Sequence, residues 1–333
     1  MHIYELVVLG LLVLGLVLML KRYANMIGIL DIPNSRSEHR IAIPRSGGVA
    51  FISAVMILIY TFHYSLYEEY SFVFLAIFII FCLGLLDDRY NIGYYTKFIV
   101  IALATFLVSL NGIVIESLGT YINTDIVLGI FALPFTVFAV VGFSNAFNLI
   151  DGLDALASSL AIVMFIAFML IGYYFSDDMI FFISIYCFVA VSTFVFFNWH
   201  PASIFMGDSG SLTLGFIISV LSIKSMQYLP PISLLMVGAI PVIDTIVVIL
   251  RRLKMSKSIF APDKCHIHHI LKDAFEGHTQ ITVLFLVCLQ MLYILFGLVL
   301  VDFEWLIFVI FSTSLLVFYK LTIKFIVKTH RSC

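Results

Sequence analysis

The chain alternates long apolar runs with short polar connections over almost its whole length. The apolar runs are continuous and do not alternate residue by residue, which favours spanning helices over the strands of a membrane barrel. Only helices and closed barrels satisfy every backbone hydrogen bond in lipid, so the pattern predicts an all-α, polytopic integral membrane protein. We expect about 11 transmembrane helices, at about residues 3–20, 47–62, 71–86, 98–115, 126–142, 158–174, 179–197, 211–223, 231–250, 281–300 and 304–319.

These segments predict a single membrane-embedded domain over residues 1–333. No separate soluble region is visible between them, and no repeat with a period of 20–50 residues is found. The first apolar run has no basic stretch before it and no small-residue cleavage site after it. We therefore interpret it as a retained spanning helix and not as a signal peptide.

The basic residues predict the orientation of the helices. Cytoplasmic loops of membrane proteins carry an excess of Lys and Arg. When the helices are threaded in order, every Lys and Arg except Lys224 falls on the side reached after the first helix. This places the N-terminus outside and the C-terminus in the cytoplasm. The net charge of -2 and the lack of a basic run give no indication of nucleic-acid binding.

Polar residues are scarce in a chain that is 62% hydrophobic and 11% charged, so their grouping is informative. They gather in five motifs, all on the predicted cytoplasmic side. The motifs are LDIPNSRSEHRIAIPRSGG (30–48), GLLDDRYNIGYYTKF (84–98), GFSNAFNLIDGLDALASS (142–159), FNWHPASIFMGDSGS (197–211) and RRLKMSKSIFAPDKCHIHHILKDAF (251–275). The protein therefore has one working face.

Asp87 and Asp88 end the third apolar run. Adjacent carboxylates repel each other unless a cation or a proton relieves the repulsion, so this pair is either a base or metal ligand that faces phosphate or a solvated helix end. Lys97 begins the next helix and is a phosphate-binding candidate, although a lone Lys there is more often a membrane anchor.

The MGDSGS segment places Asp208 directly before an apolar helix. Asp208 is suited to cap that helix. However, Gly207 and Gly210 allow the backbone to approach a ligand closely, and a helix N-terminus favours anions. We favour Asp208 as a Mg²⁺ ligand beside phosphate, since Mg²⁺ usually takes one or two protein oxygens together with phosphate and water.

Asn145, Asn148, Asp151 and Asp154 recur every three residues. Residues three apart on an α-helix lie about 60° apart around its axis, so four of them cannot all face one ligand from a regular helix. Their convergence requires a 3₁₀-like turn or a break, which Gly152 allows. The alternative, a helix-end cap, explains at most two of the four.

His266, His268 and His269 lie in the longest predicted cytoplasmic loop. They are candidates for binding phosphate or sugar hydroxyls, with a zinc site as the alternative. Asp244 lies inside the ninth apolar segment, where a carboxylate costs about 2.5–3.5 kcal/mol near the centre of a span. We expect it to form a structural pair with Arg251. Arg36, in PNSRSEH, is a weak candidate for substrate binding.

Together these motifs resemble the polyprenyl-phosphate N-acetylhexosamine-1-phosphate transferases. That family includes enzymes that initiate bacterial O-antigen, enterobacterial common antigen and teichoic-acid synthesis, and the phospho-N-acetylmuramoyl-pentapeptide transferase of peptidoglycan synthesis. The resemblance extends from DIPNSR (31–36) to HIHH (266–269), and NAFNLIDGLDALA, FMGDSGS and APDKCHIHH carry most of it. Ser37 stands where the family usually has Lys, and Ala155 where the last Gly of DGLDG is usual.

The resemblance implies transfer of a sugar 1-phosphate from a UDP-sugar to undecaprenyl phosphate, with release of UMP. N-acetylglucosamine is the expected sugar, and the expected place is the cytoplasmic face of a bacterial inner membrane, where the reaction would initiate an envelope polysaccharide. The alternatives are the muramoyl-pentapeptide transferase or, from another class, a proton- or ion-coupled transporter. Transporter sites usually lie near the bilayer midplane between repeated halves, which this chain lacks.

The resemblance also implies roles for the candidate residues. Asn148 and Asp208 would hold Mg²⁺, with Mn²⁺ as an alternative metal, and Asp87 or Asp88 would activate the lipid phosphate beside the catalytic Asp208. The remaining candidates would bind substrate: Asn145, Asp151, Asp154, His266, His268, His269, Lys97 and Arg36.

Overall fold

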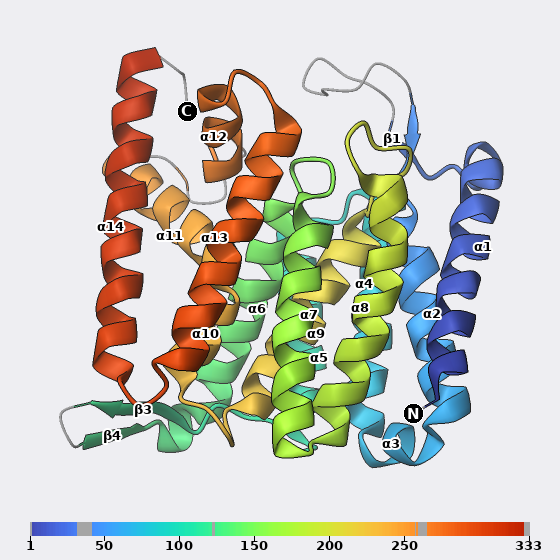
Figure 1. Cartoon of the computed structure of the whole chain (residues 1–333), viewed down its shortest axis with the longest axis horizontal. Helices are drawn as coiled ribbons and strands as arrows, with labels where there is room; N and C mark the ends of the chain where they lie inside the picture. Colours follow the sequence, from blue (N-terminus) through green and yellow to red (C-terminus); the bar gives the residue numbers. More distant parts are fainter. Residues whose placement is uncertain (1, 32–41, 122–123, 257, 259–264, 330–333) are drawn as a thin grey trace.

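The computed structural model describes residues 2–31, 42–121, 124–256, 258 and 265–329 (Figure 1). Within these ranges the chain is mostly helical, as predicted. Its helices are α1 (Ile3–Ile27), α2 (Gly47–Phe62), α3 (Tyr64–Glu69), α4 (Ser71–Tyr90), α5 (Tyr94–Ser109), η1 (Gly129–Phe131), α6 (Ala132–Ile150), α7 (Leu156–Phe175), α8 (Asp178–Asn198), α9 (Asp208–Ser225), α10 (Pro231–Val237), α11 (Ala239–Lys254), α12 (Ile267–Ala274), α13 (Thr279–Val299) and α14 (Glu304–Thr329).

The lengths of these helices indicate a polytopic membrane protein. Among the described residues, seven helices are long and apolar enough to cross a membrane, or eight if the bent pair α10 and α11 is one span. The other predicted segments coincide with the shorter apolar helices α2 and α5 and with α9. Each predicted apolar segment therefore coincides with a helix or with the bent pair. The count of eleven crossings and the orientation stay predictions.

Two small antiparallel sheets make the all-α expectation incomplete. Strand β1 (Leu30–Asp31) pairs with β2 (Ile43–Pro44), and β3 (Ser117–Tyr121) pairs with β4 (Thr124–Val127). The helix expected from about residue 126 begins at Ala132, because Ile126 and Val127 belong to β4. Both residues are β-branched, which favours an extended strand over the first turn of a helix.

The helices run side by side in one bundle with two distinct ends (Figure 1). The start of α1, the short helix α3 and the β3–β4 hairpin lie at one end, which we call the hairpin end. Helix α12, strand β1 and the C-terminal end of α14 lie at the opposite end, which we call the site end. The described parts of all five polar motifs map to elements that begin or finish at the site end, so for these residues the grouping predicted from the sequence holds in space.

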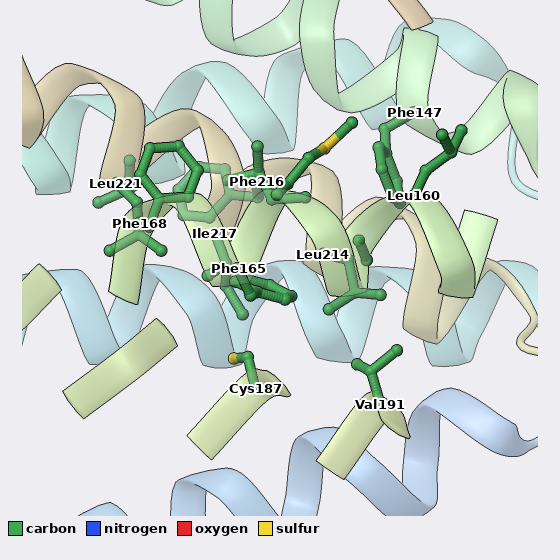
Figure 2. Packing of buried hydrophobic residues seen from close by; sticks show 14 of the residues in the cluster. Phe147, Leu160, Phe165, Phe168, Cys187, Val191, Leu214, Phe216, Ile217 and Leu221 are labelled. Carbon is green, nitrogen blue, oxygen red and sulfur yellow. The ribbon is translucent and has the colours of Figure 1, made fainter. Parts of the chain in front are cut away.

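Helix α9 lies at the centre of the bundle, packed against α2, α4, α6 and α7. Its apolar side chains interlock with Phe165 and Phe168 of α7 and with Val191 of α8 (Figure 2). Five of its hydroxyl side chains donate to a carbonyl oxygen one turn earlier along the chain, as Thr213 does to that of Ser209 at 2.7 Å. Because α9 is buried nearly all round, its N-terminus is a fixed reference point for the site end.

Helices α10 and α11 meet at an angle of 88° across Gly238. Such a break leaves backbone groups without helical partners, which is costly away from water. The fully buried side chain of Gln290, on α13, supplies hydrogen-bond partners for these backbone groups. Its Nε2 donates to the carbonyl oxygens of Met236 (3.0 Å) and Val237 (2.9 Å), and its Oε1 accepts from the N–H of Ile240 at 3.0 Å.

Replacing Gln290 with Met is therefore expected to lower the free energy of unfolding by about 2 kcal/mol or more, since each buried polar group left unpaired costs about 1–3 kcal/mol. The thermal unfolding midpoint in detergent measures this loss. The matched control is Gln280→Met, because Gln280 makes one exposed hydrogen bond, to the carbonyl oxygen of His200. Equal midpoints for the two variants would contradict the role of Gln290.

Candidate active site

The N-terminus of α9 is capped by a carboxylate from α4. The Asp88 side chain accepts the backbone N–H groups of Asp208 at 2.7 Å and of Ser209 at 3.0 Å. These are two of the donors that a helix N-terminus leaves unpaired, and a negative charge there is favourable. Asp88 thus joins the DDRY and MGDSGS motifs and fills the capping role expected of Asp208.

Glycines make this close junction feasible. Gly207 has a φ of +74°, and a Cβ atom there would lie 2.7 Å from an Asp88 carboxylate oxygen. A Cβ on Gly48, at the start of α2, would lie 2.1 Å from the backbone nitrogen of Gly210. Gly207 and Gly210 therefore permit close packing of protein against protein, and the close approach of a ligand there stays a prediction.

Two basic side chains converge on Asp208. Lys97 Nζ lies 2.7 Å from Oδ2 of Asp208 and 2.5 Å from Oδ2 of Asp87, so it bridges the two carboxylates. Arg45 Nη2 lies 3.6 Å from Oδ1 of Asp208. We call Arg45, Asp87, Lys97 and Asp208 the acid–base centre. Lys97 is part of this centre and not merely an anchor at the membrane surface.

The geometry separates Asp87 from Asp88. While Asp88 is held by the end of α9, Asp87 accepts the backbone N–H of Ile92 at 2.6 Å. That bond closes the turn after α4, where Asn91 adopts the left-handed conformation (φ 50°) that Asn tolerates well. The other oxygen of Asp87 faces Lys97, which leaves Asp87, of the two acids, in the acid–base centre.

Arg45 is a member of the centre that we did not predict. Its backbone forms a bridge with Phe205, and the N–H of Phe205 donates to the carbonyl oxygen of Pro44 at 2.8 Å. This pairing carries Arg45 to Asp208 from 163 residues away in the sequence. Opposite charges strengthen the contact and raise the pKa of Arg45 despite its burial. The sequence feature that could have indicated this role is the position of Arg45 shortly before the Gly47–Gly48 pair that begins α2.

The third motif spans a helix break, as its spacing predicts. Helix α6 ends at Ile150 and α7 begins at Leu156, so Asp151 and Asp154 lie in the turn between them. Asn148 is still on α6 and donates from Nδ2 to Oγ of Ser211 on α9 at 2.8 Å, which leaves its Oδ1 as an acceptor near the acid–base centre. Asn145 is half-buried and makes no side-chain hydrogen bond to the described residues.

The two acids of the turn have different surroundings. Burial raises the pKa of Asp151 to about 7, the charge of Asp208 adds to the rise and Arg45 opposes it. Asp154 accepts from His200 Nδ1 at 2.7 Å and from the N–H of Ala202 at 3.1 Å. Asp151 therefore belongs electrostatically to the acid–base centre, whereas Asp154 is tied to the loop after α8.

The histidine motif lies against the same turn. A Cβ atom on Gly152 would lie 2.4 Å from Nε2 of His268, so this ring rests on the turn that carries Asp151. His268 is buried, and burial keeps its pKa well below the ordinary value, with the neighbouring His269 adding to the effect. Neither nitrogen of His268 has a hydrogen-bond partner among the described residues. The His269 ring lies half-buried beside it, with ring centroids 4.3 Å apart.

The expected pairing of Asp244 with Arg251 is wrong. Asp244 accepts from His266 Nδ1 at 2.7 Å and from the N–H of Ile267 at 2.6 Å. Arg251 instead donates to the carbonyl oxygen of Cys265 at 2.9 Å. Although Asp244 and Arg251 share a helix face, the segment before α12 returns to α11 and takes both side chains.

The acid–base centre together with the neighbouring Asp88 and Asp151 fits a divalent cation. Four carboxyl groups, those of Asp87, Asp88, Asp151 and Asp208, outnumber the two basic side chains, Arg45 and Lys97. In the described part of the chain no three His, Cys, Asp or Glu side chains are arranged to hold a metal alone. One or two protein oxygens completed by phosphate and water is the usual arrangement for Mg²⁺. Arg36 lies outside the described residues.

Comparison with known proteins supports the family resemblance of the sequence motifs. Over 274 residues the chain is 34% identical to the probable undecaprenyl-phosphate N-acetylglucosaminyl 1-phosphate transferase of Bacillus subtilis (strain 168), covering 80% of this chain and 76% of that relative. The chain belongs to the polyprenyl-phosphate N-acetylhexosamine-1-phosphate transferase family. The undecaprenyl-phosphate alpha-N-acetylglucosaminyl 1-phosphate transferases of Escherichia coli (strain K12) and Yersinia pestis are each 30% identical to it, over 79% and 84% of this chain and 74% and 79% of their own lengths.

Residues 70–226 match glycosyl transferase family 4. This region contains α4 to α9 and therefore all members of the acid–base centre except Arg45. It also contains Asn148 and both acids of the α6–α7 turn. The resemblance found in the sequence motifs is thus confirmed.

Ala155, where the family usually has Gly, adopts a left-handed conformation with a φ of 62°. A Cβ atom strains this conformation by about 1–2 kcal/mol, and β-branched side chains are rarely found there. We expect the free energy of unfolding of Ala155→Gly to lie within about 1 kcal/mol of the wild-type value, because the relief of backbone strain offsets the greater entropy of the unfolded chain. Ala155→Val should lose at least about 2 kcal/mol. Thermal unfolding of the pair tests this, and equal midpoints would refute it.

Proposed function

We propose that this protein transfers N-acetylglucosamine 1-phosphate from UDP-N-acetylglucosamine to undecaprenyl phosphate and releases UMP. The observation that carries the proposal is the acid–base centre at the N-terminus of α9, where two carboxylates share Lys97 and Arg45 approaches Asp208. The relatives' names supply the acceptor lipid and the sugar. The reaction would initiate synthesis of an envelope polysaccharide.

The transfer requires an oxygen of the lipid phosphate to attack the β-phosphorus of the donor. Asp87 is the acid we assign to accept a proton from the lipid phosphate or to orient it, because its Oδ2 faces Lys97 and not a helix end. Asp88 would hold the start of α9 in place through its two backbone hydrogen bonds. Lys97 and Arg45 would move from the carboxylates to the phosphate oxygens of the substrates, since both are positively charged and donate strong hydrogen bonds to phosphate.

Asp208 and Asn148 are the residues that would hold Mg²⁺ or Mn²⁺. Asp208 would supply a carboxylate from the first turn of α9. Asn148, whose Nδ2 donates to Ser211 on the same helix, would supply its amide oxygen. When bound, the metal ion would neutralise the diphosphate and stabilise the leaving UMP.

The donor nucleotide and sugar would occupy the region between the acid–base centre and α12. Asn145, Asp151 and Asp154 would order the nucleotide, and His266, His268 and His269 would bind phosphate or sugar. The contact between His268 and Gly152 supports this division, because it unites the histidines and the acids of the turn in one surface. Arg36 and Lys97 complete the proposed substrate-binding set.

Residues 1–333 would act as a single domain with eleven spans, an external N-terminus and the site end on the cytoplasmic face of a bacterial inner membrane. This orientation is supported by the described parts of the polar motifs, which lie at one end of the bundle (Figure 1). UDP-sugars are cytoplasmic, so the donor site must face that compartment.

The proposal is tested with purified protein in nanodiscs, Mg²⁺, undecaprenyl phosphate and a panel of UDP-sugars. We expect lipid-dependent UMP release with UDP-N-acetylglucosamine, abolished by EDTA and restored by Mg²⁺ or Mn²⁺. Release with UDP-N-acetylmuramoyl-pentapeptide alone would assign the protein to the peptidoglycan branch. No release with any donor would refute the transferase function and leave the transporter alternative.

A further inference from the structure

Asp244 is a buried carboxylate on α11 for which the proposed reaction has no direct use. Its side chain is only 1% exposed, and a charged group at this depth persists only when it is well paired. Both of its oxygens are used. Oδ2 lies 2.7 Å from His266 Nδ1, and Oδ1 accepts the N–H of Ile267 at 2.6 Å.

Side chains of α11 bind residues 265–267, which lead into α12. Asp244 and Arg251 are seven residues, about two turns, apart and therefore lie on one face of α11. Asp244 contacts His266 and Ile267, while Arg251 donates to the carbonyl oxygen of Cys265 at 2.9 Å. Three consecutive residues before and at the start of α12 are thus fixed by side chains of α11. The direction of α11 is set by the break between α10 and α11, whose backbone groups bond to Gln290.

The contact with Ile267 satisfies an unpaired donor. His266 is the N-cap of α12 and makes no side-chain capping bond, so the first backbone N–H groups need other partners. A carboxylate also interacts favourably with the positive end of the helix. Asp244 therefore caps α12 from a different helix.

The contact with His266 determines which ring nitrogen carries the proton. A carboxylate can only accept a hydrogen bond, so Nδ1 must be the donor. Nε2 is then the nitrogen on the side of the ring away from Asp244. A carboxylate behind an imidazole fixes the tautomer and the ring orientation and stabilises the imidazolium form.

We propose that Asp244 is a positioning residue that holds His266, through its Nδ1–H, in the orientation and the charged form that donate Nε2–H to substrate phosphate. His266 stacks on His268 with ring centroids 5.5 Å apart, and His268 rests on the turn that carries Asp151. Asp244 thereby fixes the histidine side of the site relative to the acids. This inference rests on the proposed transferase function.

The decisive variant is Asp244→Asn, which has nearly the same shape. Its amide oxygen can still accept the N–H of Ile267, but its NH₂ group would face Nδ1 of His266, and the uncharged amide would no longer stabilise the imidazolium form. We expect kcat/KM for the UDP-sugar to fall about 10- to 100-fold, by analogy with the loss seen when the hydrogen-bonded partners of metal-ligating histidines are removed. Full activity of Asp244→Asn would overturn the inference.

The second measurement is a double-mutant cycle with His266→Ala. If Asp244 acts through His266, Asp244→Asn should change kcat/KM less than about threefold in the His266→Ala background. An equal loss in both backgrounds would show a general structural role and overturn the inference.

The matched control is Glu5→Gln. Glu5 is another buried carboxylate with a histidine partner, His63 Nε2 at 3.2 Å, but it lies on α1 near the hairpin end. Its substitution should leave kcat/KM within about twofold of the wild type; a loss as large as that of Asp244→Asn would mean that any buried carboxylate gives this effect, which overturns the inference. An inactive wild type would instead refute the proposed function, so the two failures are distinguishable.

Discussion

Asp208→Asn is expected to lower kcat/KM by at least about a thousandfold while the protein stays folded and inserted. A carboxylate that holds a metal ion and balances two cations contributes several kcal/mol to the transition state, and each 1.36 kcal/mol is a factor of ten in rate. The fold should survive because the contact that caps α9 uses the backbone N–H of Asp208, which the substitution keeps.

The matched control is Asp178→Asn. Asp178 is also the first residue of its helix, α8, but it is exposed at the other end of the bundle. Its substitution should change neither kcat/KM nor the unfolding midpoint measurably. Steady-state kinetics at saturating Mg²⁺, with unfolding measured on the same preparations, compares the two. Full activity of Asp208→Asn would remove Asp208 from the reaction.

Asp87→Asn and Asp88→Asn are expected to fail in different ways. Loss of a general base costs about 10²- to 10⁴-fold in rate, so Asp87→Asn should lose kcat with an unchanged unfolding midpoint. In Asp88→Asn one amide oxygen replaces two acceptors, so one N–H at the start of α9 loses its partner. We expect a loss of about 1–2 kcal/mol of stability, as for other helix caps, and a smaller loss of kcat.

This comparison needs no separate control, because each variant serves as the control for its neighbour. Unfolding midpoints and kcat measured on both give four values with a crossed pattern. The division of roles would be contradicted if Asp88→Asn lost more activity than Asp87→Asn at unchanged stability.

The positions of the helices follow from the sequence because lipid imposes a simple rule on each segment. An apolar run of sufficient length must become a helix to satisfy its backbone, and each of the predicted runs coincides with a helix or with the bent pair α10–α11. The grouping of the polar motifs at one end was equally accessible, since the Lys and Arg residues predict that all five motifs lie on the same side. The β4 strand was not, because Ile126 and Val127 are apolar in either conformation.

Individual contacts in the site were harder to predict because they depend on helix rotation and on long-range pairing. Asp87 and Asp88 are adjacent, but successive residues point about 100° apart on a helix, so only the packing of α4 on α9 decides which acid becomes the cap. Arg45 reaches Asp208 through backbone pairing with Phe205, which no local pattern reveals. Asp244 had a plausible partner on its own helix, and the return of residues 265–267 to α11 decided against it.

These contacts give each motif a distinct part in one site. The α4 motif supplies the cap of α9 and a second acid that shares Lys97, and the α9 motif supplies Asp208. The α6–α7 turn links this centre to the histidines of α12. Such an arrangement can bind a diphosphate between acids, bases and imidazoles while the acceptor lipid stays in the membrane.

In the proposed reaction the sugar moves together with the β-phosphate of the donor. The most direct measurement uses UDP-N-acetylglucosamine labelled with ³²P at the β-phosphorus, incubated with the purified protein, Mg²⁺ and undecaprenyl phosphate. We expect the label to appear in the extracted lipid and unlabelled UMP to accumulate in equal amount. Label that remains in the aqueous phase as UDP while the sugar moves to lipid would contradict it.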